Sequence, residues 1–366
     1  QKMSQTFSDI YACKLAYIKM LSSMESLYAV ACDLQDADAI STEDFAATED
    51  LNNRIWEGYE NGTISLADAQ SCDEINNSPL YPTYDENGVL QINNSANFMF
   101  FCQKVKAGDT HLNAVMNADV NLCTADQMLG DYFGVFDGQY HTLTVNINRE
   151  ADDAAFIEYL NGTVKNLIVR GTITTTAKYA AGIAAHSYAG SSLNNIQSYV
   201  DIISSIEGDG THAGLVAVAE GSTVISNSLF AGTMTGSATT CCGGIVGWAS
   251  AAVTMNNVLQ IGDIQVNGEG SSTFSRNNGN LTCNNCYYKT LFTAVKSSGT
   301  TQVTDDQLIS GEVCYNLNGG TAPNAYTVWT QTLGVDAYPL PQPNRGYVGL
   351  VDGAYTNVEL DEDDKV

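Results

Sequence analysis

Short alternating runs of apolar and polar residues return through the middle of the chain at a nearly constant interval. Each run places an Asn before a mostly apolar residue, as in Asn166-Leu167 and Asn257-Val258. Five such residues lie 29, 32, 30 and 28 positions apart by subtraction, and we call them the Asn column: Asn166, Asn195, Asn227, Asn257 and Asn285. A fixed period of about thirty residues predicts stacked supersecondary units.

The composition of each unit indicates which kind of repeat it forms. The units are rich in Thr, Val, Ile, Ser, Asn and Gly, and runs such as residues 167–173 are typical of short strands bounded by turns. Repeats of paired helices and leucine-rich repeats do not fit this composition. The pattern predicts a right-handed parallel β-helix, and an irregular sandwich with accidental periodicity is the alternative.

The Asn column has a physical explanation in a β-helix. Asn tolerates the left-handed conformation of a sharp turn, and stacked Asn amides can hydrogen-bond from coil to coil. We expect the residue after each Asn to point inward, which gives a second column: Leu167, Ile196, Ser228, Val258 and Cys286.

A second phrase recurs between the Asn residues, in Ala-Gly-Ile-Ala, Ala-Gly-Leu-Val and Gly-Gly-Ile-Val, with aligned glycines Gly182, Gly214 and Gly244. The alignment stacks His186, Val218 and Trp248 at one position, and Tyr188 and Glu220 two residues further on. Aromatic faces beside a carboxylate suit sugar rings or a protein partner. His186, Tyr188, Glu220 and Trp248 are therefore the candidate ligand-binding residues, although Trp248 and Tyr188 can also be explained as closing the edge of a coil.

The flanks of the repeat have other patterns. Apolar residues at steps of three and four predict one helix over residues 4–35, and Ser41 with Asp44 predicts the start of a second helix that ends at Asn61-Gly62. Ser65 is a candidate cap for a third short helix. A strand, a helix over residues 95–107 and another strand are expected before the repeat, and Thr304 is expected to cap a helix after it.

These patterns divide the chain into four parts. We expect a helical module at residues 1–80, an N-terminal cap at 81–130, β-helix repeats at 131–292, and a C-terminal cap with an acidic tail at 293–366. The helical module either docks a partner protein or spaces the solenoid from its anchor.

The charge and polar composition of the chain indicate which partners and which location are expected. Among 366 residues, 41 are acidic and 15 are basic, which gives a net charge of −26 and disfavours nucleic acid and anionic lipid as partners. Solvated faces rich in Thr, Ser, Asn and Gly favour an extracellular protein. The chain begins Gln1-Lys2-Met3, so we expect a processed, mature form, with a lipid anchor upstream as one option.

Candidate chemistry is sparse. Cys283 and Cys286 form a single CxxC motif, which we interpret as packed core, and Cys241-Cys242 as one outward and one inward residue. Asp152 and Asp153 are sequence neighbours that point apart on an extended chain, and Asp201, Glu220 and Asp263 are expected in different columns. We therefore expect no catalytic residues, no metal and no cofactor.

Several phrases resemble a known family. Phe136-Asp137-Gly138-Gln139-Tyr140 and Gly243-Gly244-Ile245-Val246-Gly247 are similar to the GLUG-motif family of bacterial surface proteins, and passages within residues 85–122 and 310–339 are similar to the same group in gut Bacteroidetes. The resemblance covers about residues 85–348. Ala217 departs from the motif. The resemblance implies a β-helix and a cell-surface setting, as in adhesins and accessory segments.

The sequence therefore favours a non-enzymatic surface-binding protein. The resemblance suggests either an adhesin or a lipid-anchored accessory protein beside an outer-membrane nutrient importer of the SusC/SusD type, docked through its N-terminal helices. Its ligand would be a glycan or a host protein. The alternative is a carbohydrate-active enzyme, a polysaccharide lyase or glycoside hydrolase, on the same scaffold.

Overall fold

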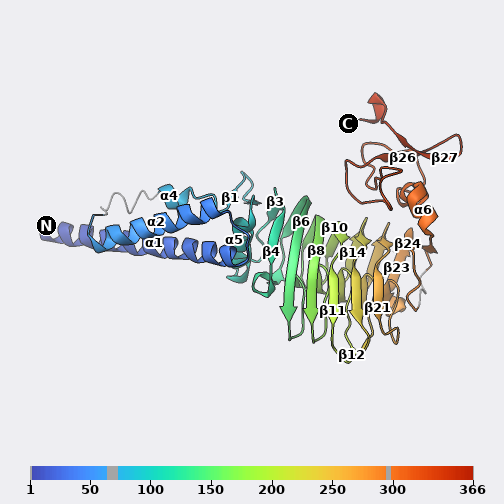
Figure 1. The fold of residues 1–366 in the computed structure, drawn as a ribbon, viewed down its shortest axis with the longest axis horizontal. Helices are drawn as coiled ribbons and strands as arrows, with labels where there is room; N and C mark the ends of the chain where they lie inside the picture. The colour runs from blue at the N-terminus through green and yellow to red at the C-terminus, as the bar shows by residue number, and fades with distance from the viewer. Residues whose placement is uncertain (1, 64–72, 294–297, 366) are drawn as a thin grey trace. The chain divides into compact units, whose positions relative to one another are not determined.

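The chain forms two compact units in the computed structural model, Gln1–Phe101 and Cys102–Val366. The structure describes residues 2–63, 73–293 and 298–365 (Figure 1). Within those ranges no helix combines the length and the apolar character that crossing a bilayer requires.

Two helices dominate the first unit, as the periodicity predicts. They are α1 (Lys2–Asp36) and α2 (Thr42–Glu60). Ser41 caps α2, since its side chain accepts the N–H of Asp44 at 3.0 Å, and Asn61 ends the helix. Tyr28 of α1 packs on Phe45 of α2 with ring centroids 6.3 Å apart. The buried stripe of α1 contains Met20, Met24, Leu27, Ala31 and Leu34.

Shorter elements complete this unit. The short helix α4 (Asp73–Asn76) precedes an antiparallel pair of strands, β1 (Thr83–Tyr84) and β2 (Leu90–Ile92). The predicted helix after residue 93 is α5 (Ser95–Lys106), and the chain divides within it. The predicted helix capped by Ser65 lies outside the described residues.

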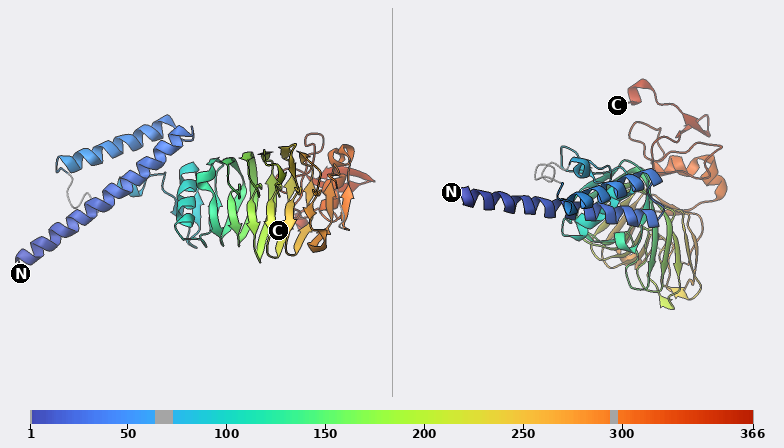
Figure 2. Two further views of the ribbon diagram at one scale, coloured as in Figure 1. Left: turned by 90° about the horizontal axis from the view of Figure 1, so that it is seen from below. Right: turned by 60° about the vertical axis from the view of Figure 1, so that its left-hand side comes forward.

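The second unit contains the predicted parallel β-helix, a solenoid of about 5 turns with about 29 residues per coil. Figures 1 and 2 show its coils stacked in chain order, from green through yellow to orange. Two parallel sheets run along the stack. Strands of the larger sheet in this unit are β3 (Ala114–Met116), β4 (Val120–Cys123), β6 (Val135–Arg149), β8 (Thr163–Thr175), β10 (Ser191–Ser198), β11 (Asp201–Ser204), β14 (Thr223–Ser226), β15 (Leu229–Phe230), β16 (Thr233–Gly236), β19 (Val253–Asn256), β20 (Leu259–Gln260), β21 (Asp263–Val266), β23 (Leu281–Asn284), β24 (Cys286–Tyr288) and β25 (Thr300–Gln302).

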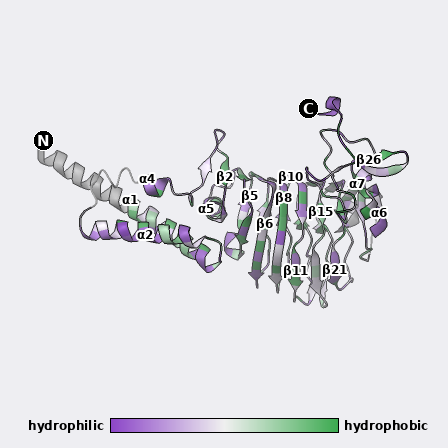
Figure 3. Cartoon of the chain, turned by 45° about the horizontal axis from the view of Figure 1, so that its top comes forward, coloured by the Kyte–Doolittle hydropathy of each residue, from purple (hydrophilic) through white to green (hydrophobic). Residues whose placement is uncertain are grey.

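The smaller sheet contributes one strand per coil, and we call it the second sheet. Its strands are β5 (Leu129–Tyr132), β7 (Ile157–Leu160), β9 (Ala184–Ser187), β13 (Val216–Ala219), β18 (Val246–Ala249) and β22 (Ser275–Arg276). A two-stranded pair, β12 (Gly208–Asp209) with β17 (Thr239–Thr240), lies between the two sheets in sequence. Along the coils hydrophobic and hydrophilic residues alternate (Figure 3), as expected where one face of a strand is buried.

The Asn column is confirmed. All five residues have positive φ, at 52°, 54°, 50°, 54° and 57°. Side-chain amides join most of them in a ladder, with Asn195 Nδ2 donating to Asn166 Oδ1 at 2.9 Å and Asn285 Nδ2 donating to Asn257 Oδ1 at 2.9 Å. The five residues that follow the column are fully buried, which confirms that they point inward: Leu167, Ile196, Ser228, Val258 and Cys286.

The segment after the last coil packs against the outer face of the larger sheet. It contains α6 (Asp305–Ser310), α7 (Glu312–Leu317) and the hairpin of β26 (Tyr347–Val351) with β27 (Ala354–Val358). Thr304 caps α6 as predicted, with Gln307 completing a capping box. The buried Trp329 lies in one core cluster with Leu229 of β15 and Leu259 of β20. This segment therefore covers residues from several coils.

The cysteines lie as the sequence predicts. Cys283 and Cys286 are buried at 4% and 0% exposure, and Cys242 is buried whereas Cys241 is half-buried. The free thiols include these four residues together with Cys32, Cys102, Cys123 and Cys314.

A candidate binding groove on the second sheet

Small residues ahead of each strand hold the coils of the second sheet in register. A Cβ on Gly182 would lie 2.2 Å from the backbone oxygen of Gly214, and one on Gly214 would lie 2.4 Å from Phe230 Cγ. Both distances are shorter than real Cβ contacts allow, so these positions require Gly at this spacing. The glycine alignment inferred from the sequence is therefore confirmed.

One side chain from each strand then falls in a single row, which we call the groove row. Strand pairing confirms the predicted alignment, with Val218 opposite both His186 and Trp248. It also extends the alignment beyond the three coils that the Gly phrase marks. The full row is Asp131, Tyr159, His186, Val218, Trp248 and Arg276.

His186 lies between two carboxylates. Its Nδ1 is 2.7 Å from Glu220 Oε1, and its Nε2 is 2.6 Å from Asp153 Oδ1. Burial by itself would lower the pKa of His186, but the hydrogen bonds and charges of Asp153 and Glu220 raise it above its usual value. The imidazolium form can donate to both carboxylates at once and joins three coils through side chains alone.

Aromatic rings surround this histidine. The Tyr159 ring stacks on it with centroids 5.4 Å apart, and the Tyr179 ring lies 5.0 Å away. The Tyr159 hydroxyl donates to the second oxygen of Asp153 at 3.2 Å. Burial and the neighbouring Glu220 carboxylate raise the pKa of Tyr188, so its hydroxyl stays protonated as a donor.

Trp248 and Arg276 form the other end of the groove row. The Trp248 side chain is 38% exposed, and the guanidinium carbon of Arg276 lies 5.1 Å from its ring centroid. Arg276 Nε donates to the backbone oxygen of Gly247 at 2.9 Å, and Nη2 donates to Thr211 Oγ1 at 2.7 Å. The Arg276 guanidinium is therefore held in place beside an exposed indole.

Asp209 forms ion pairs with both basic residues at this end of the groove row. Lys178 Nζ is 3.1 Å from one carboxylate oxygen, and Arg276 Nη2 is 3.6 Å from the other. Although burial alone would raise it, the pKa of Asp209 is lowered by the Thr211 hydroxyl and by the charges of Lys178 and Arg276. The carboxylate stays ionised and ties the loop of residues 209–211 to β22.

A groove of about 390 Å³ lies over this arrangement. Its lining includes Glu220 and Trp248 together with Lys178, Asp209 and Arg276. Two of the four residues expected to bind a ligand, Glu220 and Trp248, line this groove, and His186 contacts Glu220 directly. Tyr188 is near Tyr159, with centroids 6.4 Å apart, but it does not line the groove.

Sequence reasoning missed several residues of this site, among them Asp153, Tyr159, Lys178, Asp209 and Arg276. Tyr159 and Arg276 belong to coils in which Ala155 and Thr273 replace the aligned glycine, and Asp153 lies at a turn with φ of 72°. The pattern of small residues before a large apolar one, in Ala154-Ala155-Phe156, was the signal that could have found the first of these coils.

The carboxylates elsewhere are arranged partly as predicted. Asp152 and Asp153 bind different partners, since Asp152 Oδ1 accepts the N–H of Lys178 at 3.0 Å. The prediction that Asp201 and Asp263 occupy different columns is wrong, because both pair with Thr233 in one column. Asp201 and Asp263 therefore lie two coils apart, with Thr233 between them. Within the described ranges, no group of three or more His, Cys, Asp or Glu side chains is arranged to hold a metal ion.

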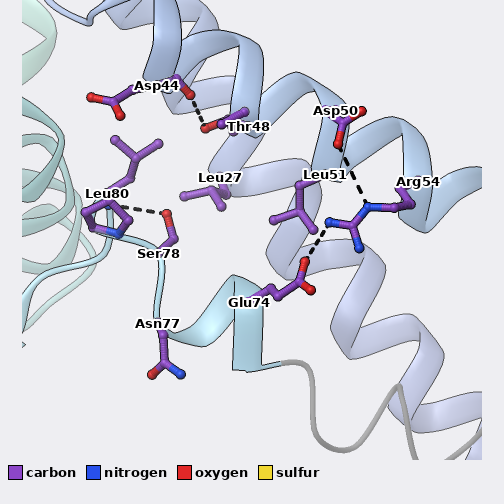
Figure 4. A pocket seen from close by; sticks show the side chains of 12 residues that line it. Leu27, Asp44, Thr48, Asp50, Leu51, Arg54, Glu74, Asn77, Ser78 and Leu80 are labelled. Carbon is purple, nitrogen blue, oxygen red and sulfur yellow. Dashed lines mark hydrogen bonds and ion pairs between the residues drawn. The ribbon is translucent and has the colours of Figure 1, made fainter.

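The helical unit has a cavity of its own, of about 600 Å³ (Figure 4). Leu27 of α1, Leu51 of α2 and Leu80 of the following loop line it. At its rim Arg54 pairs with Glu74 at 2.6 Å and with Asp50 at 3.9 Å. The cavity is therefore lined by leucine side chains and bordered by the charged side chains of Asp50, Arg54 and Glu74.

Comparison with known proteins gives a distant structural relative. No family model matches the chain, and no curated protein sequence matches it either. A crystal structure of a protein from Bacteroides ovatus, provisionally described as an immunoglobulin A1 protease, is similar with a TM-score of 0.47 and 14% identity. The similarity covers 71% of this chain and 94% of the other. At that distance a shared activity does not follow.

Proposed function

We propose that this chain is a non-enzymatic surface protein that binds a glycan in the groove of the second sheet. The observation that carries the proposal is the half-exposed Trp248 ring, which lines one groove with the Glu220 carboxylate and the Arg276 guanidinium. An exposed indole stacks on the apolar face of a sugar ring, and charged side chains beside it hydrogen-bond to hydroxyl groups.

Binding accounts for the carboxylates better than cleavage does. Glycoside hydrolysis needs two carboxyl groups open to the scissile bond. The Asp153 side chain is only 12% exposed and binds His186 and Tyr159, and Asp209 is neutralised by two cations. Glu220, at 39% exposure, is left as an acceptor of hydrogen bonds. The rival proposal, a carbohydrate-active enzyme, would require a second exposed carboxylate that, unlike Asp209, is not paired with cations.

A glycan array followed by calorimetry tests the binding proposal. We expect the intact chain to bind a glycan and Trp248→Ala to lose most of that binding. Trp56→Ala is the matched control, since Trp56 of the helical unit is 37% exposed and lies outside the groove. Equal binding by the two variants, or release of shortened products on incubation, would contradict the proposal.

The setting of the protein is part of the same proposal. We propose an extracellular location at the outer membrane, with a lipid anchor, as an adhesin or beside a SusC/SusD-type importer. The acidic surface and the apolar cavity of the helical unit support a docking role for residues 1–80. A pull-down from membranes in mild detergent should recover an outer-membrane transporter, and Leu51→Ser should lose it while keeping glycan binding. Recovery of this chain alone would count against the accessory role.

A further inference from the structure

The Arg276 end of the groove row differs in charge from the middle of the row, and this difference bears on the ligand. At one end Lys178 and Arg276 share the single carboxylate of Asp209, so the cluster has one positive charge in surplus. In the middle of the row, Glu220 and Asp153 share the single imidazole of His186. The chain has only 15 basic residues against 41 acidic ones, and two of the basic residues converge here.

Arg276 keeps donors available. Its Nε and Nη2 bind Gly247, Thr211 and Asp209, whereas Nη1 has no hydrogen-bond partner in the part of the chain that the structure describes. The guanidinium is fixed by these contacts and by the Trp248 ring, and its side chain is 13% exposed. The Nη1 group can donate to an oxygen of a carboxylate or sulfate, and the fixed position of the guanidinium reduces the entropy lost on binding.

Lys178 lies on the same lining. Its side chain is 34% exposed, and an ammonium has three donors, of which one faces Asp209. Lys178 and Arg276 come from segments far apart in sequence, and they meet because the coils stack. Two cations around one groove lower the cost of bringing an anion into it.

We infer that the Arg276 end of the groove binds an oxyanion substituent of the glycan, a carboxylate or sulfate group on the sugar that stacks on Trp248. This inference rests on the proposed glycan binding and names its ligand class. The next sugar lies toward Glu220, where an anion would be repelled and a hydroxyl group would donate. Neighbouring strands are about 4.8 Å apart, so the step from one row position to the next is close to that of one sugar ring.

An array of uronate-, sialate- and sulfate-bearing oligosaccharides, printed beside the neutral parent of each, tests the inference. We expect a carboxylated or sulfated glycan to bind about tenfold or more tightly than its parent, because a hydrogen bond to a charged group contributes that much. Separate carboxylated and sulfated arms identify which oxyanion the groove takes. Added NaCl should weaken the anionic ligand more than the neutral one.

Three variants with the same change of charge locate the effect. Arg276→Gln and Lys178→Gln should each reduce the preference for the charged ligand, and Lys178→Gln guards against a folding defect in the first variant. Arg170→Gln, outside the groove over the Tyr199 ring, should leave the preference unchanged. Equal affinity for charged and neutral partners, with binding still dependent on Trp248, overturns this inference alone. Absence of binding to every glycan overturns the proposed function as well.

Discussion

Asn195 and Asn227 occupy the same turn of neighbouring coils, yet their side-chain amides do not hydrogen-bond to each other. Asn227 Nδ2 donates instead to Asn194 Oδ1 at 3.4 Å, which leaves Asn195 Oδ1 buried without a hydrogen-bond partner among the described residues. The next step is intact, with Asn257 Nδ2 donating to Asn227 Oδ1 at 3.2 Å. The interruption coincides with the longest step of the repeat, 32 residues.

Because the ladder is interrupted at Asn195, an Asn→Gly substitution should destabilise the fold by different amounts at different positions of the Asn column. Asn257→Gly keeps the positive φ accessible but removes hydrogen bonds to Asn227 and Asn285. Asn195→Gly removes one ladder bond and also removes a buried acceptor that has no partner. We expect Asn257→Gly to be about 1–2 kcal/mol less stable than Asn195→Gly in urea unfolding, because an unsatisfied buried group is itself costly.

Asn257→Ala serves as the control for backbone strain. Alanine loses the same bonds as glycine and adds the cost of a left-handed conformation, so we expect a further loss of about 1 kcal/mol. Equal unfolding midpoints for the Gly and Ala variants would show that residue 257 no longer adopts the left-handed conformation in the Ala variant.

His186 makes stability depend on pH on the alkaline side. Burial lowers its pKa, but Asp153 and Glu220 raise it to a value above the usual 6.5. Its charged contacts are therefore fully present below about pH 6.5, and their contribution is lost as pH rises through the raised pKa. The unfolding free energy of the wild type should approach that of His186→Gln as pH increases above 6.5. A constant difference in unfolding free energy between wild type and His186→Gln above pH 6.5 would contradict this prediction.

His212 has the opposite dependence. It is fully buried, accepts the N–H of Ala180 on Nδ1 and lies 2.8 Å from Ser204 Oγ through Nε2. Burial lowers its pKa to about 4, so the folded protein keeps it neutral where the unfolded chain is protonated. Stability should fall by roughly 3 kcal/mol between about pH 6.5 and 4, and His212→Asn should flatten this part of the profile. Parallel profiles for wild type and variant would contradict the prediction.

Substitutions of Trp329 and Trp248 should have different effects on stability. Trp329 is completely buried beside Leu229 and Leu259, so Trp329→Ala should cost about 3–5 kcal/mol and expose the C-terminal segment to protease. Trp248→Ala should cost no more than about 1 kcal/mol, since its ring is partly exposed and packs against the Arg276 guanidinium. A large loss of stability in Trp248→Ala would show that the ring has a structural role.

The sequence was informative where backbone geometry restricts residue choice. Positive φ at each turn favours Asn, and close approach between coils requires Gly, so both columns could be identified without coordinates. These columns also placed His186, Val218 and Trp248 in one row across neighbouring coils. The charge pairs could not be found this way, because His186 and Asp153 meet through a turn whose direction depends on the packing of the coil around it. The partial exposure of Trp56 and Tyr59 on α2 likewise followed from packing, which helical spacing alone does not specify.

The groove row draws one side chain from each coil, and this arrangement affects how such a protein can diversify. A mutation at Val218 or Trp248 alters a single position of the groove row while the inward columns stay intact. Duplication of one unit of about 29 residues would lengthen the row by one strand spacing, about 4.8 Å, without a change of architecture. The length of the row and the chemistry of its side chains can therefore change independently during evolution, the first by copying coils and the second by point substitution.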